Sequence, residues 1–156
     1  MLPAHSVRES PNSATALVFR EEDQHMRFVI DLNVALRLIE ERSAIPAQNS
    51  LVAPTLLRSQ ILSDLFASVN RGEFDRREAD SRLNHMRALN IRLLGDRVLQ
   101  QVAWDTAIAL GWDDTLKAEY VALTRLQADA FVTLDASLAR SLKGIIPIRS
   151  FDDLFS

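Results

Sequence analysis

The sequence contains no cysteine, which excludes disulfide bonds, thiolate metal sites and cysteine nucleophiles. It has only four glycines, and none forms a glycine-rich loop after a predicted strand, which counts against nucleotide-binding Rossmann and P-loop folds. Lysine is scarcer still, because Lys117 and Lys143 are the only two among 18 basic residues. No apolar run approaches the length of a membrane span, so we expect no membrane partner.

The remaining composition is that of an ordinary globular domain. A chain of 156 residues that is 47% hydrophobic and 25% charged favours one domain with a sizeable core. The formal net charge of -3 gives no overall basic field that would indicate nucleic acid. Residues 1–25 differ from the rest in their prolines and polar residues, and we predict a flexible extension or a mis-assigned start there. Residues 26–156 are then the folded domain.

From Met26 onward, short apolar runs alternate with segments of helical periodicity. Strands are expected at 28–30, 51–53, 91–94, 130–134 and 145–148, the last at a sheet edge because of its proline. Helices are expected at 33–42, from Pro54 onward, at 75–89, at 97–110, from Asp113 or Asp114, and from Asp135 to Gly144. This alternation predicts an α/β fold, a three-layer α/β/α sandwich with a parallel sheet of about five strands.

Two features of the helices have ordinary structural interpretations. Trp104 and Trp112 are expected to pack a pair of helices rather than to stack on bases. The segment around 70–90 is rich in arginine but also in acids, so we expect a solvated face of balanced charge. The residues concerned are Arg71, Arg76, Arg77, Arg82, Arg87, Glu73, Asp75, Glu78 and Asp80.

Two predicted strands end in an acid, Asp31 after the first and Asp135 after the fourth. In open α/β sheets, ligands bind beyond the carboxyl ends of the strands, where the strand order reverses. Each aspartate alone is adequately explained as the N-cap of the next helix. If their strands are neighbours, however, the two carboxylates converge, and an all-oxygen cluster of this kind suits Mg²⁺ or Mn²⁺.

Four short segments resemble motifs of the PIN-domain family, and in particular the VapC-type toxins of bacterial toxin–antitoxin pairs. They are residues 28–34 (FVIDLNV), 54–60 (PTLLRSQ), 118–123 (AEYVAL) and 131–135 (FVTLD). The resemblance implies an α/β/α sandwich with the first and fourth strands adjacent. It also implies a cytoplasmic Mg²⁺- or Mn²⁺-dependent endoribonuclease that binds RNA, is inhibited by a cognate antitoxin and forms a homodimer.

The chain departs from that family at two of four acidic positions. Asp31 and Asp135 match the first and fourth acids, whereas Gln60 stands at the second and Lys117 at the third. Asp114 lies about one helical turn before Lys117 and would approach the site only if the helix start were distorted or lengthened. The resemblance therefore implies a metal site with two acids, an amide and an ammonium group.

Lys117 decides how much activity to expect. A charged ammonium beside a divalent ion would repel it, so Lys117 must either turn to solvent or occupy the metal's place between Asp31 and Asp135. We expect the second arrangement in the metal-free protein. The replacement of the second acid by Gln60 weakens the metal site less, because an amide oxygen still ligates a hard cation.

Two functional hypotheses follow. The first is a VapC-like endoribonuclease in which Asp31 and Asp135 hold Mg²⁺ or Mn²⁺, Gln60 or Asp114 completes the set, and activity is weakened or lost. The second is a catalytically degenerate PIN domain that binds RNA or an antitoxin without cutting. A phosphatase with Asp31 as nucleophile is weaker, because Asn33 and Ala35 replace the second acid and the threonine expected there.

Overall fold

The computed structural model describes residues 25–156, and the prediction for residues 1–25 lies almost wholly outside them. Five strands form one parallel sheet: β1 (Met26–Ile30), β2 (Asn49–Pro54), β3 (Arg92–Leu94), β4 (Ala130–Val132) and β5 (Ile148–Arg149). Their order is β3-β2-β1-β4-β5, which places β1 at the centre between β2 and β4. The predicted α/β sandwich with about five parallel strands is confirmed.

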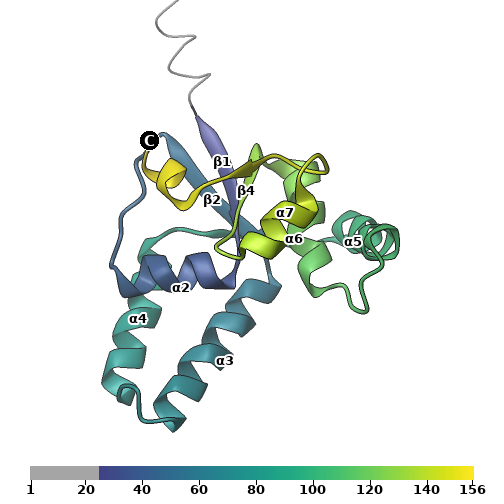
Figure 1. The fold of residues 1–156 in the computed structure, drawn as a ribbon. Coiled ribbons are helices and arrows are strands. Elements are labelled where there is room, and N and C mark those ends of the chain that lie inside the picture. The colour runs from purple at the N-terminus through teal and green to yellow at the C-terminus, as the bar shows by residue number, and fades with distance from the viewer. Residues whose placement is uncertain (1–24) are drawn as a thin grey trace, which may run out of the picture.

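Six α-helices and one short 3-10 helix surround the sheet in the described part of the chain (Figure 1). They are α2 (Leu32–Glu40), α3 (Leu56–Asn70), α4 (Arg76–Ala88), α5 (Arg97–Leu110), α6 (Leu116–Gln127), α7 (Ala136–Leu142) and the 3-10 helix η1 (Phe151–Phe155). Helix α6 packs on β1, β2 and β4 and carries α5 on its other side, whereas α2 packs with α3 and α4. In Figure 1, the α3–α4 hairpin projects away from the sheet on the side opposite α5.

The core forms where the buried strands meet the apolar faces of the helices. The strand segment Phe28, Val29 and Ile30 is buried to within 2% exposure, and so is Phe131 in β4. Strands of a parallel sheet with helices on both sides are apolar throughout, because neither face meets water. This explains why continuous apolar runs in the sequence located β1, β2 and β4.

Helix ends follow the capping residues that the sequence provides. Asp75 and Asp96 accept hydrogen bonds from the backbone N–H groups of Glu78 and Leu99, at 2.9 Å and 2.8 Å. Gly111 ends α5 in the left-handed conformation at φ 68°, which glycine adopts without steric cost. These predicted boundaries are confirmed.

Several boundaries differ from expectation, and β4, expected over 130–134, ends at Val132. Pro54 ends β2 rather than beginning α3, whose N-cap is Thr55. The N-cap position of α6 is Thr115, whose side chain makes no capping hydrogen bond. Asp114, one of the two predicted caps, does accept a hydrogen bond from Leu116 N at the start of the helix. The last strand lies at the predicted edge but begins only at Ile148, because the chain is still turning through Ile145 and Ile146 after α7.

The arginine-rich segment forms ion pairs, as predicted. Arg71 pairs with Glu73, Arg76 with Asp80, and Arg82 with Glu78, at nitrogen–oxygen distances of 2.8–3.2 Å.

The prediction for the tryptophans holds only for one of them. Trp112 packs against the core, but Trp104 is 65% exposed on the outer face of α5. Helix α6 contacts the opposite face of α5, which buries Ala103 and Ala107 there.

Candidate metal-binding site

Asp31 lies where β1 ends and α2 begins, at the centre of the sheet. Its backbone is extended, and its Oδ1 accepts a hydrogen bond from Val34 N at 3.2 Å, so it caps α2. Its Oδ2 accepts a second hydrogen bond from the Thr133 hydroxyl at 2.6 Å. The carboxylate is therefore held by two elements that are far apart in sequence.

Asp135 occupies the equivalent place after β4 and caps α7 through a 3.0 Å hydrogen bond from Leu138 N. Its own backbone N–H donates to the Thr133 hydroxyl at 3.2 Å, so this threonine bridges the two aspartates. Because β1 and β4 pair in parallel with Ile30 opposite Val132, both strands end at the same sheet edge. Asp31 and Asp135 therefore both cap a helix and both lie at the same edge of the sheet.

One cavity of about 150 Å³ brings together four of the five predicted site residues. Asp31, Gln60, Lys117 and Asp135 all line it, and they come from the ends of β1 and β4 and from helices α3 and α6. Asp114 does not line it. That side chain is exposed before α6 and accepts a hydrogen bond from Leu116 N at 3.0 Å, so the helix start is not extended toward the cavity.

Burial is the main influence on the Asp31 carboxyl and raises its pKa above the ordinary value of 3.8. The hydrogen bond from Thr133 opposes this effect, and the negative charge of Asp135 adds to it. A carboxylate that is costly to ionise beside a second carboxylate gains from any nearby cation. A cation bound between Asp31 and Asp135 would therefore stabilise both carboxylates in their ionised form.

Tyr120 is a site residue to which the sequence assigned no role beyond its place in the motif at 118–123. Its side chain is 5% exposed, lines the cavity and donates a hydrogen bond to Gln60 Oε1 at 2.6 Å. Burial and the charges of Asp31 and Glu119 raise the pKa of the phenol, so it stays a neutral donor. Its position three residues after Lys117, almost one helical turn, is the signal that could have identified it.

Lys117 does not occupy the place expected for it. Its side chain is exposed, and within residues 25–156 it forms no ion pair with Asp31 or Asp135. The physical reason is the cost of removing the ammonium group from water, which Lys117 avoids by remaining exposed. The hydrogen bonds from Val34 N and the Thr133 hydroxyl occupy one acceptor site on each Asp31 oxygen and leave the other sites for a ligand.

The donors in the cavity are two carboxylates and one amide oxygen, which are the hard oxygen ligands that Mg²⁺ and Mn²⁺ prefer. Within residues 25–156, no group of three or more histidine, cysteine, aspartate or glutamate side chains is arranged to hold a metal ion. The residues that would hold a hard cation are Asp31, Asp135 and Gln60. Asn33 also lines the cavity and offers a further amide oxygen.

These observations define an α/β sandwich with an acidic cavity at the carboxyl edge of its central strands. No family model and no curated protein matches the chain. Among solved structures, it is similar to PAE2754 from Pyrobaculum aerophilum, with a TM-score of 0.59 and 17% sequence identity over 83% of this chain and 93% of that one. Similarity at this level of identity establishes the fold.

The described helices also bear on the prediction about membranes. Within residues 25–156, none is both long enough and apolar enough to cross a bilayer.

Proposed function

We propose that the chain is a PIN-like endoribonuclease of the VapC type that depends on Mg²⁺ or Mn²⁺ and has weakened activity. The observation that carries this proposal is the convergence of Asp31 and Asp135 in one cavity beyond the ends of β1 and β4. That cavity is where an open parallel sheet binds ligands. The resemblance of residues 28–34 and 131–135 to PIN motifs supports the same assignment.

In this mechanism, Asp31, Asp135 and the Gln60 amide oxygen hold the cation. When bound, the metal supplies a hydroxide nucleophile and stabilises charge on the phosphodiester oxygens. Cleavage would add one water across the bond between phosphorus and the 3′ oxygen. The water oxygen would end on phosphorus, one water proton on the departing 3′ oxygen and the other in solvent, which would leave a 3′-hydroxyl and a 5′-phosphate. Thr133 keeps Asp31 oriented, and Tyr120 keeps Gln60 oriented.

In this proposal, Lys117 contacts the RNA backbone, because its ammonium group is exposed at the cavity rim. A flexible lysine there can turn away from the cation and meet a phosphate oxygen of the RNA. The cost is lower metal affinity, since the cation and the ammonium repel each other. A cognate antitoxin, a homodimer and a cytoplasmic location belong to the same proposal.

A second candidate is a PIN-like module that binds RNA or an antitoxin without cutting. It is favoured by the donor set, in which an amide and an ammonium stand at two of the four positions where the family has acids. The Gln60 oxygen also already accepts the Tyr120 hydroxyl, which leaves it one lone pair for a metal.

Calorimetric titration with Mn²⁺ and an RNA-cleavage assay separate these candidates. We compare the wild type with Lys117→Asp, which replaces the ammonium by a carboxylate, and use Lys143→Asp as control because the other lysine does not line the cavity. We expect Lys117→Asp to bind Mn²⁺ at least tenfold more tightly, about 1.4 kcal/mol, and Lys143→Asp to match the wild type.

Saturable Mn²⁺ binding and metal-dependent cleavage by the wild type would support the endoribonuclease. Binding and cleavage that appear only in Lys117→Asp would support the non-cleaving module. If neither protein binds Mn²⁺, the cavity is not a metal site and both the ligand set and the mechanism are wrong.

A further inference from the structure

The cavity at Asp31 has two chemically different sides. Asp31 and Asp135, at the ends of β1 and β4, contribute acceptor oxygens, whereas Gln60 and Lys117 line the same cavity from helices α3 and α6. The proposed mechanism uses only the oxygen of the Gln60 amide and leaves its nitrogen without a role. Together with the ammonium group of Lys117, this nitrogen puts hydrogen-bond donors on the helical side of the cavity.

The hydrogen bond from Tyr120 fixes which end of the Gln60 amide is free. The phenol donates to Oε1 at 2.6 Å, and burial raises the pKa of the phenol, so it remains a protonated donor. Within residues 25–156, this is the only hydrogen bond of the Gln60 side chain. The two N–H groups of Nε2 therefore have no protein acceptor there, and a ligand oxygen in the cavity would supply one.

Lys117 adds a positive charge on the same side of the cavity. It lies three residues before Tyr120, almost one helical turn, so the two share a face of α6. Its side chain is exposed and forms no ion pair within the described part of the chain. Its three N–H donors are therefore available to an anionic oxygen.

The charges of the cavity favour an anion once a cation is bound. Asp31, Asp135 and Lys117 carry two negative charges and one positive charge, so a divalent cation would make the total positive. Four acids around the same cation would leave the total negative and would repel a dianion. A phosphate monoester carries a charge of about -1.5 to -2 at neutral pH, against about -1 for a phosphodiester. This donor set therefore attracts the monoester more strongly.

We propose that Gln60 Nε2 and the Lys117 ammonium group form a subsite for the terminal 5′-phosphate of an RNA chain. One phosphate oxygen would bind the cation held by Asp31 and Asp135, and the other two would accept hydrogen bonds from Gln60 and Lys117. A phosphodiester has only two free oxygens, so it cannot satisfy all three partners. The inference rests on the proposed cation site, and it implies that the product strand with the new 5′-phosphate leaves slowly and inhibits cleavage.

The size of the cavity agrees with a phosphate group as its occupant. Its volume is about 150 Å³, whereas sites for whole small molecules usually measure roughly 300–1,000 Å³. The phosphate would therefore enter the cavity while its nucleoside stays outside.

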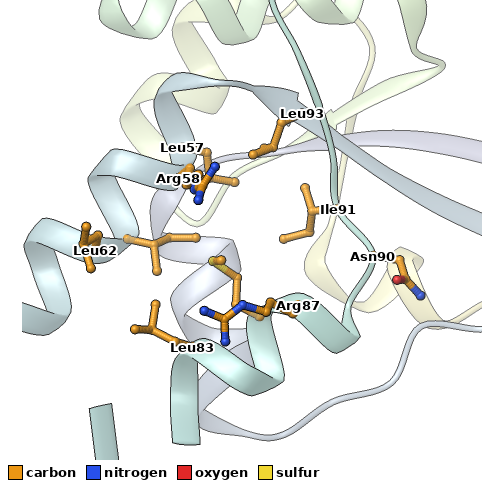
Figure 2. Close-up of a pocket in the computed structure, with 10 residues that line it drawn as sticks. Leu57, Arg58, Leu62, Leu83, Arg87, Asn90, Ile91 and Leu93 are labelled. Atoms are coloured by element: carbon orange, nitrogen blue, oxygen red, sulfur yellow. The ribbon is translucent and has the colours of Figure 1, made fainter. Parts of the chain in front are cut away.

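The larger cavity of about 580 Å³ lacks this pairing of charges. It lies between α3, α4 and the chain that leads into β3 (Figure 2). Arg58 and Arg87 line it, but no carboxylate does, and it shares no lining residue with the Asp31 cavity. Its arginines can hold a phosphate without a cation, so this cavity is the alternative site that the test has to exclude.

Calorimetric titration with adenosine 5′-monophosphate in Mg²⁺ tests the subsite, and the methyl ester of that nucleotide, a phosphodiester, is the comparison ligand. We compare the wild type with Gln60→Glu, which keeps the acceptor for Tyr120 but removes the N–H donors, and with Lys117→Met, which removes the charge. The matched controls are Lys143→Met, outside both cavities, and Arg87→Met, in the larger one. Circular dichroism checks that every variant folds.

We expect the wild type to bind the monophosphate about tenfold more tightly than the methyl ester, and to lose most of this affinity when EDTA removes the cation. Gln60→Glu and Lys117→Met should each reduce the preference for the monophosphate, and both controls should retain it. No saturable binding, equal affinity of the wild type for both ligands, or a preference that survives in both cavity variants would overturn the inference. Loss of the preference in Arg87→Met would also overturn it, because the phosphate would then bind in the larger cavity.

An RNA-cleavage assay separates this inference from the proposed function. A preference for the monophosphate without cleavage would refute the endoribonuclease and keep the subsite, whereas cleavage without the preference would refute only the subsite. If both are present, a 5′-phosphorylated oligoribonucleotide should inhibit the wild type more strongly than the 5′-hydroxyl oligomer of the same sequence. Equal inhibition by the two oligomers would contradict the slow release of product.

Discussion

At the scale of single residues, Asp31 combines a structural and a proposed functional role. It caps α2, accepts the Thr133 hydroxyl and lies within the cavity that also contains Asp135. Burial raises the pKa of its carboxyl in the folded protein above 3.8, the ordinary value. The ionised form is therefore less favourable in the folded than in the unfolded state, and Asp31 costs stability at neutral pH.

Replacing Asp31 by asparagine should stabilise the metal-free protein at neutral pH. Asparagine is also a good N-cap, so Asp31→Asn removes the buried charge and keeps the hydrogen bond from Val34 N. Its Nδ2 would donate to the Thr133 oxygen, where the carboxylate accepts from the hydroxyl. The gain should be complete above the raised pKa of the folded state and disappear as the pH falls below 3.8, where both states are protonated. Thermal unfolding across pH measures it.

The matched control is Asp96→Asn, an N-cap with a similar hydrogen bond but an exposed side chain. At neutral pH, its effect on the midpoint of unfolding measures what the change from aspartate to asparagine does at an N-cap outside the cavity. A loss of stability in Asp31→Asn at neutral pH would show that the carboxylate is worth more to the fold than its burial costs.

The individual acids of the site could be predicted, but the arrangement around them only in part. Asp31 and Asp135 were identified because each follows a buried apolar run, and that pattern fixes the end of a strand. The place of Lys117 was predicted wrongly, because the tertiary packing that leaves its side chain exposed is invisible in the sequence. The same applies to the Tyr120–Gln60 pair, which joins residues 60 positions apart.

At the scale of elements, the C-terminal segment is fastened to the start of β2. The buried Asn49 side chain donates hydrogen bonds from Nδ2 to the carbonyl oxygens of Leu154 and Ser156, at 3.0 Å and 3.1 Å. The Arg37 guanidinium of α2 lies 4.0 Å from the centre of the Phe151 ring. Thus η1 is attached to two elements at once.

Substituting Asn49 by alanine should destabilise the protein by about 1–3 kcal/mol, since the buried Leu154 carbonyl would lose its donor. Chemical unfolding measures the change in the free energy of unfolding. Gln48→Ala is the matched control, because exposed Gln48 also donates to the Ser156 carbonyl, at 3.3 Å, and its loss should cost much less. Equal costs for both would argue against a special role for the buried amide.

Element boundaries could be predicted where a cap or a glycine marks them, as at Asp75, Asp96 and Gly111. Boundaries were misplaced where the residue at the boundary is compatible with either a helix or a strand. Pro54 suits a first helical turn, but it also suits the last position of a strand, and the pairing of β2 with β3 up to Leu94 decides for the strand. A local sequence pattern does not show which distant strands pair, so it cannot place a boundary that depends on strand pairing.

At the scale of the whole molecule, ligand binding and stability are coupled. A cation that binds only the folded protein stabilises it, by about 2.7 kcal/mol at 100 times the dissociation constant. We therefore expect Mn²⁺ to raise the midpoint of thermal unfolding in the wild type. Because protons compete for Asp31, whose pKa is raised, the shift should shrink as the pH falls.

The control for this prediction is Asp31→Asn, in which the Mn²⁺-dependent shift should be lost or much smaller. An equal shift in both proteins would mean that Mn²⁺ binds elsewhere. The measurement needs no RNA, so it tests the metal site separately from cleavage.

The strand order has a consequence for the time at which the site forms. Because β1 lies between β2 and β4, the first strand made is completed by one of the last, and Thr133 meets Asp31 across 102 residues of chain. Contacts of such long separation form slowly and require nearly the whole domain to be synthesised. A ribosome that has made β1, β2 and β3 therefore carries a chain without an assembled acidic cavity. If the site cleaves RNA, the nascent chain cannot cleave the mRNA that encodes it until β4 and α7 have been synthesised.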